Sequence, residues 1–233
     1  MRSRLVVGLV VLVFFVISLI TNILGPLIPD VIRSFSLSLA MAGFLPFSFF
    51  VAYGVMSIPS GMLIERKGEK MVIASAFGVA LLGSLAFAMT PRYGVGLVSL
   101  FLIGIGMAML QVAINPLLRV AGGEEHFAFN SVMAQLIFGL ASFLSPRIYS
   151  YLVGELTGDV SQADLLVGML ARVVPKELPW ISLYWVFAAV TAVMVLVVLA
   201  VKLPKVELEE DERAGAWATH AMLLENRYVL LFT

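Results

Sequence analysis

Residues 5–29 read LVVGLVVLVFFVISLITNILGPLIP, an apolar run that carries a stripe of polar and small side chains. A hydrocarbon core about 30 Å thick needs roughly 20 apolar residues in a helix, so this run is long enough to cross a bilayer. Polar groups within lipid are costly unless they meet a partner, a cavity or a substrate. The run therefore predicts a membrane-spanning helix with one face toward a polar interior. That face carries Ser18, Thr21, Asn22 and Gly25.

Five more apolar runs follow, and the six together predict an all-α membrane protein. The chain is 61% hydrophobic, has a mean hydropathy of +1.03 and is only 13% charged, against about 25% in ordinary soluble domains. The segment Asn226 to Thr233 also starts apolar, but as a helix it would reach only about 12 Å. We interpret it as the start of a seventh span cut off by the end of the chain, and expect a longer parent protein. The six predicted spans are residues 5–29, 40–64, 71–90, 93–118, 127–153 and 181–201.

The distribution of Lys and Arg predicts a cytoplasmic N-terminus. In that orientation, ten of the 15 Lys and Arg residues lie on the cytoplasmic side, as the positive-inside rule requires. We expect a multi-pass protein of the plasma membrane, which is the inner membrane in a bacterium. The expected domains are a six-span transporter bundle at residues 1–202, an acidic cytoplasmic linker at 203–225 and the truncated span at 226–233.

The loop at residues 154–180 has a helical pattern of its own. Leu165, Leu166, Met169 and Val173 recur at helical spacing. The pattern predicts a short amphipathic helix that either lies on the membrane surface or caps the outer mouth of the bundle.

Several function classes lack the residues that they need. Net charge is zero, which gives no reason to expect nucleic acid as a partner. The chain has no Cys, none of the clusters that zinc requires, no Walker-type motif, and no Ser with a His or Lys at membrane depth for a serine protease. We therefore expect neither an enzyme nor a cofactor or metal. The pairs Gly94/Gly96 and Gly104/Gly106 lie inside an apolar helix and predict packing positions, not a nucleotide loop.

The loop between the second and third predicted spans, Gly61 to Lys70, reads GMLIERKGEK. It resembles the signature of the major facilitator superfamily: a Gly, an acid four residues on, a basic residue beside it, then a Gly and a basic residue. Gly permits close helix packing, and the neighbouring acid and base can pair with each other or with helix ends when the cytoplasmic mouth is shut. The alternative is an ordinary positive loop. The predicted cytoplasmic gate consists of Gly61, Glu65, Arg66, Gly68 and Lys70.

The end of the fourth predicted span, Gln111 to Pro116, reads QVAINP. Together with Thr21, Asn22 and Pro29, it resembles the fucose permease and glucose/galactose transporter branch of the major facilitators. The resemblance implies two six-span bundles with a sugar site between them, this chain being the N-terminal bundle and lacking the C-terminal one. It also implies that the six helices form two inverted three-helix repeats.

Amide and aromatic side chains on four predicted spans suit a sugar, which has polar edges and apolar ring faces. The alternatives are that the amides bridge helices, that the aromatic rings only pack, and that Asn115 only satisfies the carbonyl freed by Pro116. Gln111 is the strongest candidate. The predicted substrate-binding residues are Asn22, Tyr53, Gln111, Asn115, Gln135 and Phe138.

The resemblance departs from the branch at two carboxylates associated with proton coupling or substrate binding. Gly25 and Gln111 stand at those positions, and no titratable side chain lies near the middle of any predicted span. The sequence therefore supports a sugar as the substrate but gives less support to a proton as the coupling ion. It leaves open symport with a proton or sodium ion and facilitative transport. Two other functions remain open, a major facilitator exporter of amphipathic, drug-like compounds and a non-transporting six-span membrane scaffold.

Overall fold

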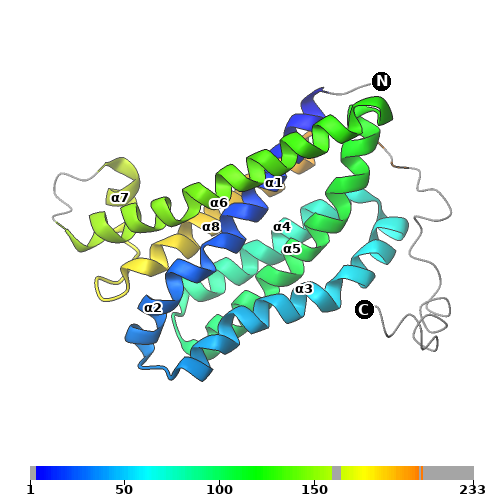
Figure 1. Ribbon diagram of the computed structural model, residues 1–233. Helices are drawn as coiled ribbons and strands as arrows, with labels where there is room; N and C mark the ends of the chain where they lie inside the picture. Colours follow the sequence, from blue (N-terminus) through cyan, green and yellow to red (C-terminus); the bar gives the residue numbers. More distant parts are fainter. Residues whose placement is uncertain (1–3, 159–163, 205, 207–233) are drawn as a thin grey trace, which may run out of the picture.

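The computed structural model describes residues 4–158, 164–204 and 206. Within these residues every regular element is a helix (Figure 1). The α-helices are α1 (Arg4–Asn22), α2 (Leu24–Phe35), α3 (Leu39–Lys67), α4 (Glu69–Met89), α5 (Tyr93–Gly122), α6 (Phe127–Thr157), α7 (Leu165–Leu170) and α8 (Ser182–Ala200), with short 3-10 turns η1 (Glu124–His126) and η3 (Pro179–Ile181).

Six helical stretches among the described residues are long and apolar enough to cross a membrane, which confirms the six predicted spans. The first consists of α1 and α2, the last of η3 and α8, and the fifth begins at η1. Helices α2 and α6 both end on one side of the bundle, which we call the α7 end. We call the opposite side the Gly68 end. The acidic residues of the predicted linker and the start of a seventh span lie outside the described residues.

The helices run side by side, with α6 along one flank of the bundle and α3 along the other (Figure 1). α1 packs against α6 and α5, while α5 packs against α3, α4 and α1. Exchanging spans one to three with spans four to six turns the α1–α6 contact into the α5–α3 contact. That pair of contacts matches two inverted three-helix repeats and places α1 and α5 at the centre, whereas the α4–α5 contact has no counterpart of similar extent between α8 and α1.

Glycines let α5 approach two neighbours closely. A Cβ added at Gly104 would lie 2.4 Å from the backbone oxygen of Phe49 on α3, and one at Gly106 would lie 2.6 Å from the backbone oxygen of Ala76 on α4. These positions, and Gly96 against a ring carbon of Phe87 at 2.7 Å, confirm the predicted packing role. The prediction is wrong for Gly94, where a Cβ would meet nothing within 4 Å.

The predicted helix in the loop between α6 and α8 is confirmed as α7. Asp164 caps its first turn, because its side chain accepts a hydrogen bond from the backbone N–H of Val167 at 2.8 Å. Val167 and Leu170 are buried and fix α7 to the bundle. The other large apolar side chains of α7 remain exposed.

Candidate functional site

The helix of the first span is interrupted at a single residue. Ile23 separates α1 from α2, and two prolines follow at positions 26 and 29. Because proline has no N–H, the carbonyls of Asn22 and Gly25 lose their helical donors. The two prolines therefore leave carbonyl acceptors inside the span.

Asn22 is held at the end of α1 by its amide nitrogen. The Nδ2 group donates to the backbone oxygen of Ser18 at 2.9 Å and to the Ser18 hydroxyl at 3.1 Å. The Ser18 hydroxyl in turn donates to the backbone oxygen of Phe138 at 2.6 Å, which joins α1 to α6. The amide nitrogen is thus engaged within the bundle, so the group that Asn22 can offer to a solute is its carbonyl oxygen, an acceptor.

Gln111 and Thr21 are half-buried side chains on the two central spans. Gln111 Oε1 and Thr21 Oγ1 are buried atoms that have no hydrogen-bond partner among the described residues. A buried polar atom without a partner costs about 1–3 kcal/mol. Such atoms on two helices that contact each other are natural points for a ligand to supply hydrogen bonds.

Asn115 lies exposed one turn beyond Gln111 on α5. Its Nδ2 group donates to the backbone oxygen of Gln111 at 3.3 Å. The carbonyl that Pro116 deprives of a donor is that of Val112, four residues before the proline. The alternative that Asn115 only satisfies this freed carbonyl is therefore wrong.

The remaining predicted residues differ in their exposure. Tyr53 on α3 is half-buried, and its ring lies 6.2 Å from that of Phe49, which is fully buried and packs in the core. Phe138 on α6 is half-buried against the same core, whereas Gln135 is exposed. The six candidates thus occupy four helices. Among them, Gln111 is the one with a buried side-chain atom that has no hydrogen-bond partner among the described residues.

The loop predicted as a gate is a single residue, Gly68, between α3 and α4. Its φ of 77° and ψ of 160° belong to a conformation that only glycine adopts readily. Lys70 donates from Nζ to the backbone oxygens of Leu199 and Val201, at 2.8 and 2.9 Å. The lysine therefore caps the end of α8, where a positive charge is favourable.

Of the other predicted gate residues, Gly61 is half-buried, and Glu65 and Arg66 are exposed at the end of α3.

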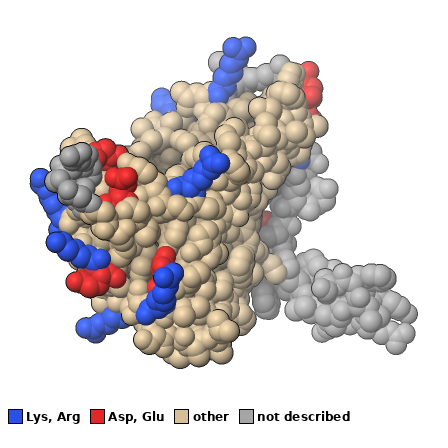
Figure 2. All heavy atoms as spheres, turned by 60° about the vertical axis from the view of Figure 1, so that its left-hand side comes forward, with Lys and Arg blue, Asp and Glu red and all other residues tan. Residues whose placement is uncertain are grey.

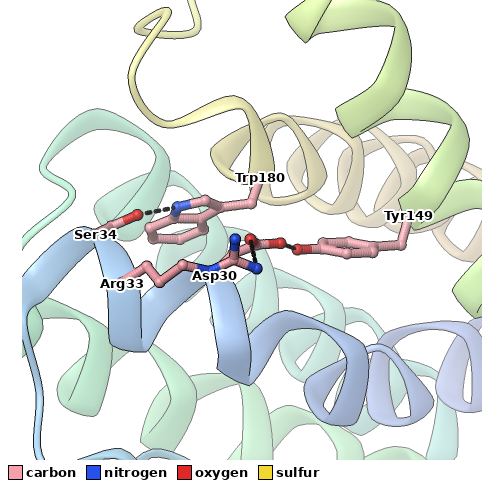
Figure 3. Close-up of polar contacts among 5 residues, drawn as sticks. All are labelled: Asp30, Arg33, Ser34, Tyr149 and Trp180. Atoms are coloured by element: carbon pink, nitrogen blue, oxygen red, sulfur yellow. Dashed lines mark hydrogen bonds and ion pairs between the residues drawn. The ribbon is translucent and has the colours of Figure 1, made fainter.

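A polar cluster at the α7 end escaped the sequence reasoning (Figure 3). Asp30 Oδ2 accepts a hydrogen bond from the Tyr149 hydroxyl, and Asp30 Oδ1 lies 3.2 Å from Nη2 of Arg33. Beside this pair, Trp180 Nε1 donates to the Ser34 hydroxyl at 2.9 Å. We call these five residues the Asp30 cluster. It joins α2 to α6 and η3, and its only local signal in the sequence was the i,i+3 spacing of Asp30 and Arg33.

Comparison with known proteins gives a consistent family match. A model of the Major Facilitator Superfamily matches residues 10–233. The chain is 26% identical to a glucose/galactose transporter of Brucella abortus over 223 residues, which are 94% of this chain and 51% of that protein. It is 30% identical to a putative glucose/galactose transporter of Helicobacter pylori over 211 residues, 89% of this chain and 50% of that protein. It is 26% identical to the L-fucose-proton symporter of Escherichia coli over 220 residues, 88% of this chain and 49% of that protein.

The chain thus spans about half the length of the curated relatives that it matches. Among solved structures, it is similar to the transporter FucP in the outward conformation, with a TM-score of 0.71 and 22% sequence identity. The similarity covers 96% of this chain and 56% of that one. The six-span bundle described above therefore has the fold of about half of that transporter.

Proposed function

Since this chain belongs to the Major Facilitator Superfamily, we propose that it forms the N-terminal six-span half of a secondary transporter for a neutral sugar. The sugar binds between this bundle and a second one, and the two bundles rock around the site to open it alternately to each side. The names of the relatives, glucose/galactose transporter and L-fucose-proton symporter, support a hexose or deoxyhexose as the substrate class.

The observation that carries this proposal is the unpartnered Oε1 atom of Gln111, one turn before the exposed Asn115 on α5. An acceptor at this position needs a donor, and sugar hydroxyls are donors. The amide nitrogens of Asn22 and Asn115 are already engaged with backbone oxygens, and the prolines free the carbonyls of Asn22, Gly25 and Val112. The candidate site is thus rich in acceptors, and it favours a solute that presents several O–H groups over an anion.

The charge of the site supports a neutral solute. None of the six candidate residues carries an ionisable carboxylate, imidazole or amine. A proton relay needs a titratable group at membrane depth, so we propose that coupling to a proton or a sodium ion, where it occurs, rests on the second bundle. In this scheme the exposed Glu65 and Arg66 at the Gly68 end act as the cytoplasmic gate, and Lys70 anchors their loop to α8.

Uptake by the intact protein tests the proposal. Purified protein is placed in proteoliposomes and offered labelled glucose, galactose and fucose, with empty liposomes as the background. We expect saturable uptake of at least one of these sugars and no uptake of the corresponding sugar acids. Transport of an amphipathic cation with no sugar uptake would instead support a drug exporter. The absence of any transport by folded protein would support a membrane scaffold.

A further inference from the structure

α7 and the residues that follow it expose an apolar surface next to charged side chains. Leu165 is 77% exposed and Met169 is 58% exposed, and Leu166 and Val173 are exposed beside them. Four large apolar side chains so close together are unfavourable in water. Because Val167 and Leu170 are buried against the bundle, the exposed set is held on the outside of the molecule.

The neighbouring helix α6 carries a long exposed apolar stripe. Its members recur every three or four residues and therefore share one helix face. Gln135 lies about a third of a turn around the helix from this stripe, so the stripe is separate from the candidate sugar site. In a membrane-spanning helix, an exposed face without polar groups is the face that suits lipid tails. The stripe consists of Phe129, Val132, Leu136, Leu140 and Phe143.

The stripe continues into residues typical of the membrane interface. The guanidinium carbon of Arg147 lies 4.6 Å from the centre of the Phe143 ring, and Tyr151 follows one turn later on the same face. Aromatic and long basic side chains gather where lipid tails give way to headgroups. Tyr151 then donates from its hydroxyl to Asp164 Oδ2 at 2.6 Å. The residue that caps α7 is thus attached to the lipid-facing side of α6.

Basic side chains complete this surface. Arg172 and Lys176 follow α7 directly, and both are exposed. Figure 2, which turns this side of the molecule forward, shows acidic and basic side chains gathered toward the end that carries α7, with a mostly uncharged surface beyond them. The acidic neighbours are Asp164, which is bonded to Tyr151 and to a backbone N–H of α7, and Glu177. A short apolar helix followed by Arg and Lys suits the lipid interface, where phosphate groups attract the basic residues.

We propose that α7 lies in the headgroup zone of the lipid bilayer, with Leu165, Leu166 and Met169 in the lipid and Arg172 and Lys176 at lipid phosphates. The partner of this surface is the phospholipid bilayer itself, not the second bundle and not another copy of the chain. The continuity of the α6 stripe with α7, through Tyr151 and Asp164, distinguishes this position from a cap over the mouth of the bundle. The inference does not depend on which solute is transported.

Spin labels at single cysteines test this position directly. Because these 233 residues contain no Cys, Met169→Cys and Leu166→Cys can each carry one nitroxide label once any cysteine elsewhere in the intact protein is replaced. The protein is placed in vesicles of phosphatidylethanolamine and phosphatidylglycerol. Collisions with oxygen, which dissolves in lipid, are compared with collisions with a nickel chelate, which stays in water. Matched controls are Leu140→Cys on the α6 stripe and Glu177→Cys on the exposed loop.

We expect the labels at positions 166 and 169 to favour oxygen, as the Leu140→Cys label does. Labels that favour the nickel chelate, as Glu177→Cys should, would place α7 in water and overturn the proposal. Labels that are immobile and reached by neither collider would show that protein covers α7, and would overturn it as well. We also expect Arg172→Gln with Lys176→Gln to move the Met169→Cys label toward the chelate only when phosphatidylglycerol is present. Loss of the oxygen preference in neutral vesicles too would contradict an attraction of Arg172 and Lys176 to the net negative charge of phosphatidylglycerol.

Discussion

The Asp30 cluster and the candidate sugar site hold their polar groups in opposite ways. At the α7 end, Asp30 and Ser34 each accept a hydrogen bond from a distant helix or turn. On the central spans, Gln111 Oε1 and Thr21 Oγ1 lack partners among the described residues. Polar groups that pair with each other stabilise the fold, whereas buried groups left unpaired lack a hydrogen bond that a ligand could supply once the site opens. Unpaired atoms alone do not define a site, because Ser99 on α5 also has one.

The largest expected effect comes from replacing Trp180, the buried aromatic residue of the Asp30 cluster. Trp180 is buried, and its ring lies 5.8 Å from Phe35 and 5.7 Å from Phe87. We expect Trp180→Ala to lower the free energy of unfolding by about 3–5 kcal/mol, as for other buried aromatic residues. Thermal or denaturant unfolding of the purified protein measures the loss. Sugar affinity of the protein that remains folded should be unchanged, and a parallel loss of affinity would break the contrast between the two regions.

The next effect isolates the bond between Asp30 and Tyr149. In a double-mutant cycle of Asp30→Asn and Tyr149→Phe, we expect a coupling energy in unfolding of about 1.5–3 kcal/mol, the range for hydrogen bonds to charged groups. Unfolding midpoints of the two single variants and the double variant supply the cycle. Strictly additive effects would show that the two side chains do not stabilise each other.

A substitution at Gln111 tests the candidate sugar site, where polar atoms lack partners. We expect Gln111→Ala to weaken sugar binding by about 1–3 kcal/mol, roughly 5- to 150-fold in Kd, with little change in melting temperature. Titration calorimetry and thermal unfolding on the same preparation measure both. Ser99→Ala on the same helix is the matched control and should leave affinity unchanged. Unchanged affinity with a lower melting temperature in Gln111→Ala would mean that Gln111 only bridges helices.

Gln111→Glu sharpens the same contrast through pH. A glutamate would bind the sugar differently in its protonated and ionised forms, so we expect uptake by this variant to depend more strongly on pH than uptake by the wild type. Uptake measured across a pH series in proteoliposomes checks this expectation. Identical pH profiles for the two proteins would place residue 111 away from the solute.

The smallest expected effect concerns α7. The hydrogen bond from Tyr151, and then that from the N–H of Val167, hold the pKa of Asp164 below its ordinary value of 3.8. Because the pKa of Asp164 is lowered in the folded state, its ionised carboxylate stabilises the fold above pH 3.8. This stabilisation is lost as the pH falls through the lowered pKa. A spin label at Met169→Cys should therefore become more mobile only at strongly acidic pH. Increased mobility already near neutral pH would show that Asp164 does not hold α7.

The sequence was sufficient for the spans but not for the contacts that join them. Apolar runs determine which segments can cross the membrane, and Gly104 and Gly106 could be recognised as packing positions from their apolar setting. The Asp30 cluster was missed because its partners are distant in sequence: Tyr149 is 119 residues from Asp30, and Trp180 is 146 residues from Ser34. Within the candidate site, residue types suggested Gln111 and Asn115, but only the geometry shows which atoms are engaged and that Asn115 donates to the Gln111 carbonyl.

The distance between Asp30 and Tyr149 has a consequence for the order in which the protein is assembled during synthesis. At translation rates of about 5–20 residues per second, the ribosome adds Tyr149 roughly 6–24 s after Asp30. Throughout that interval the first span has been made, but its acidic side chain has no partner from α6. Trp180, which completes the contact with Ser34, is made later still. The α7 end of the first span is therefore one of the last places in the bundle to close, although it belongs to the first span to be synthesised.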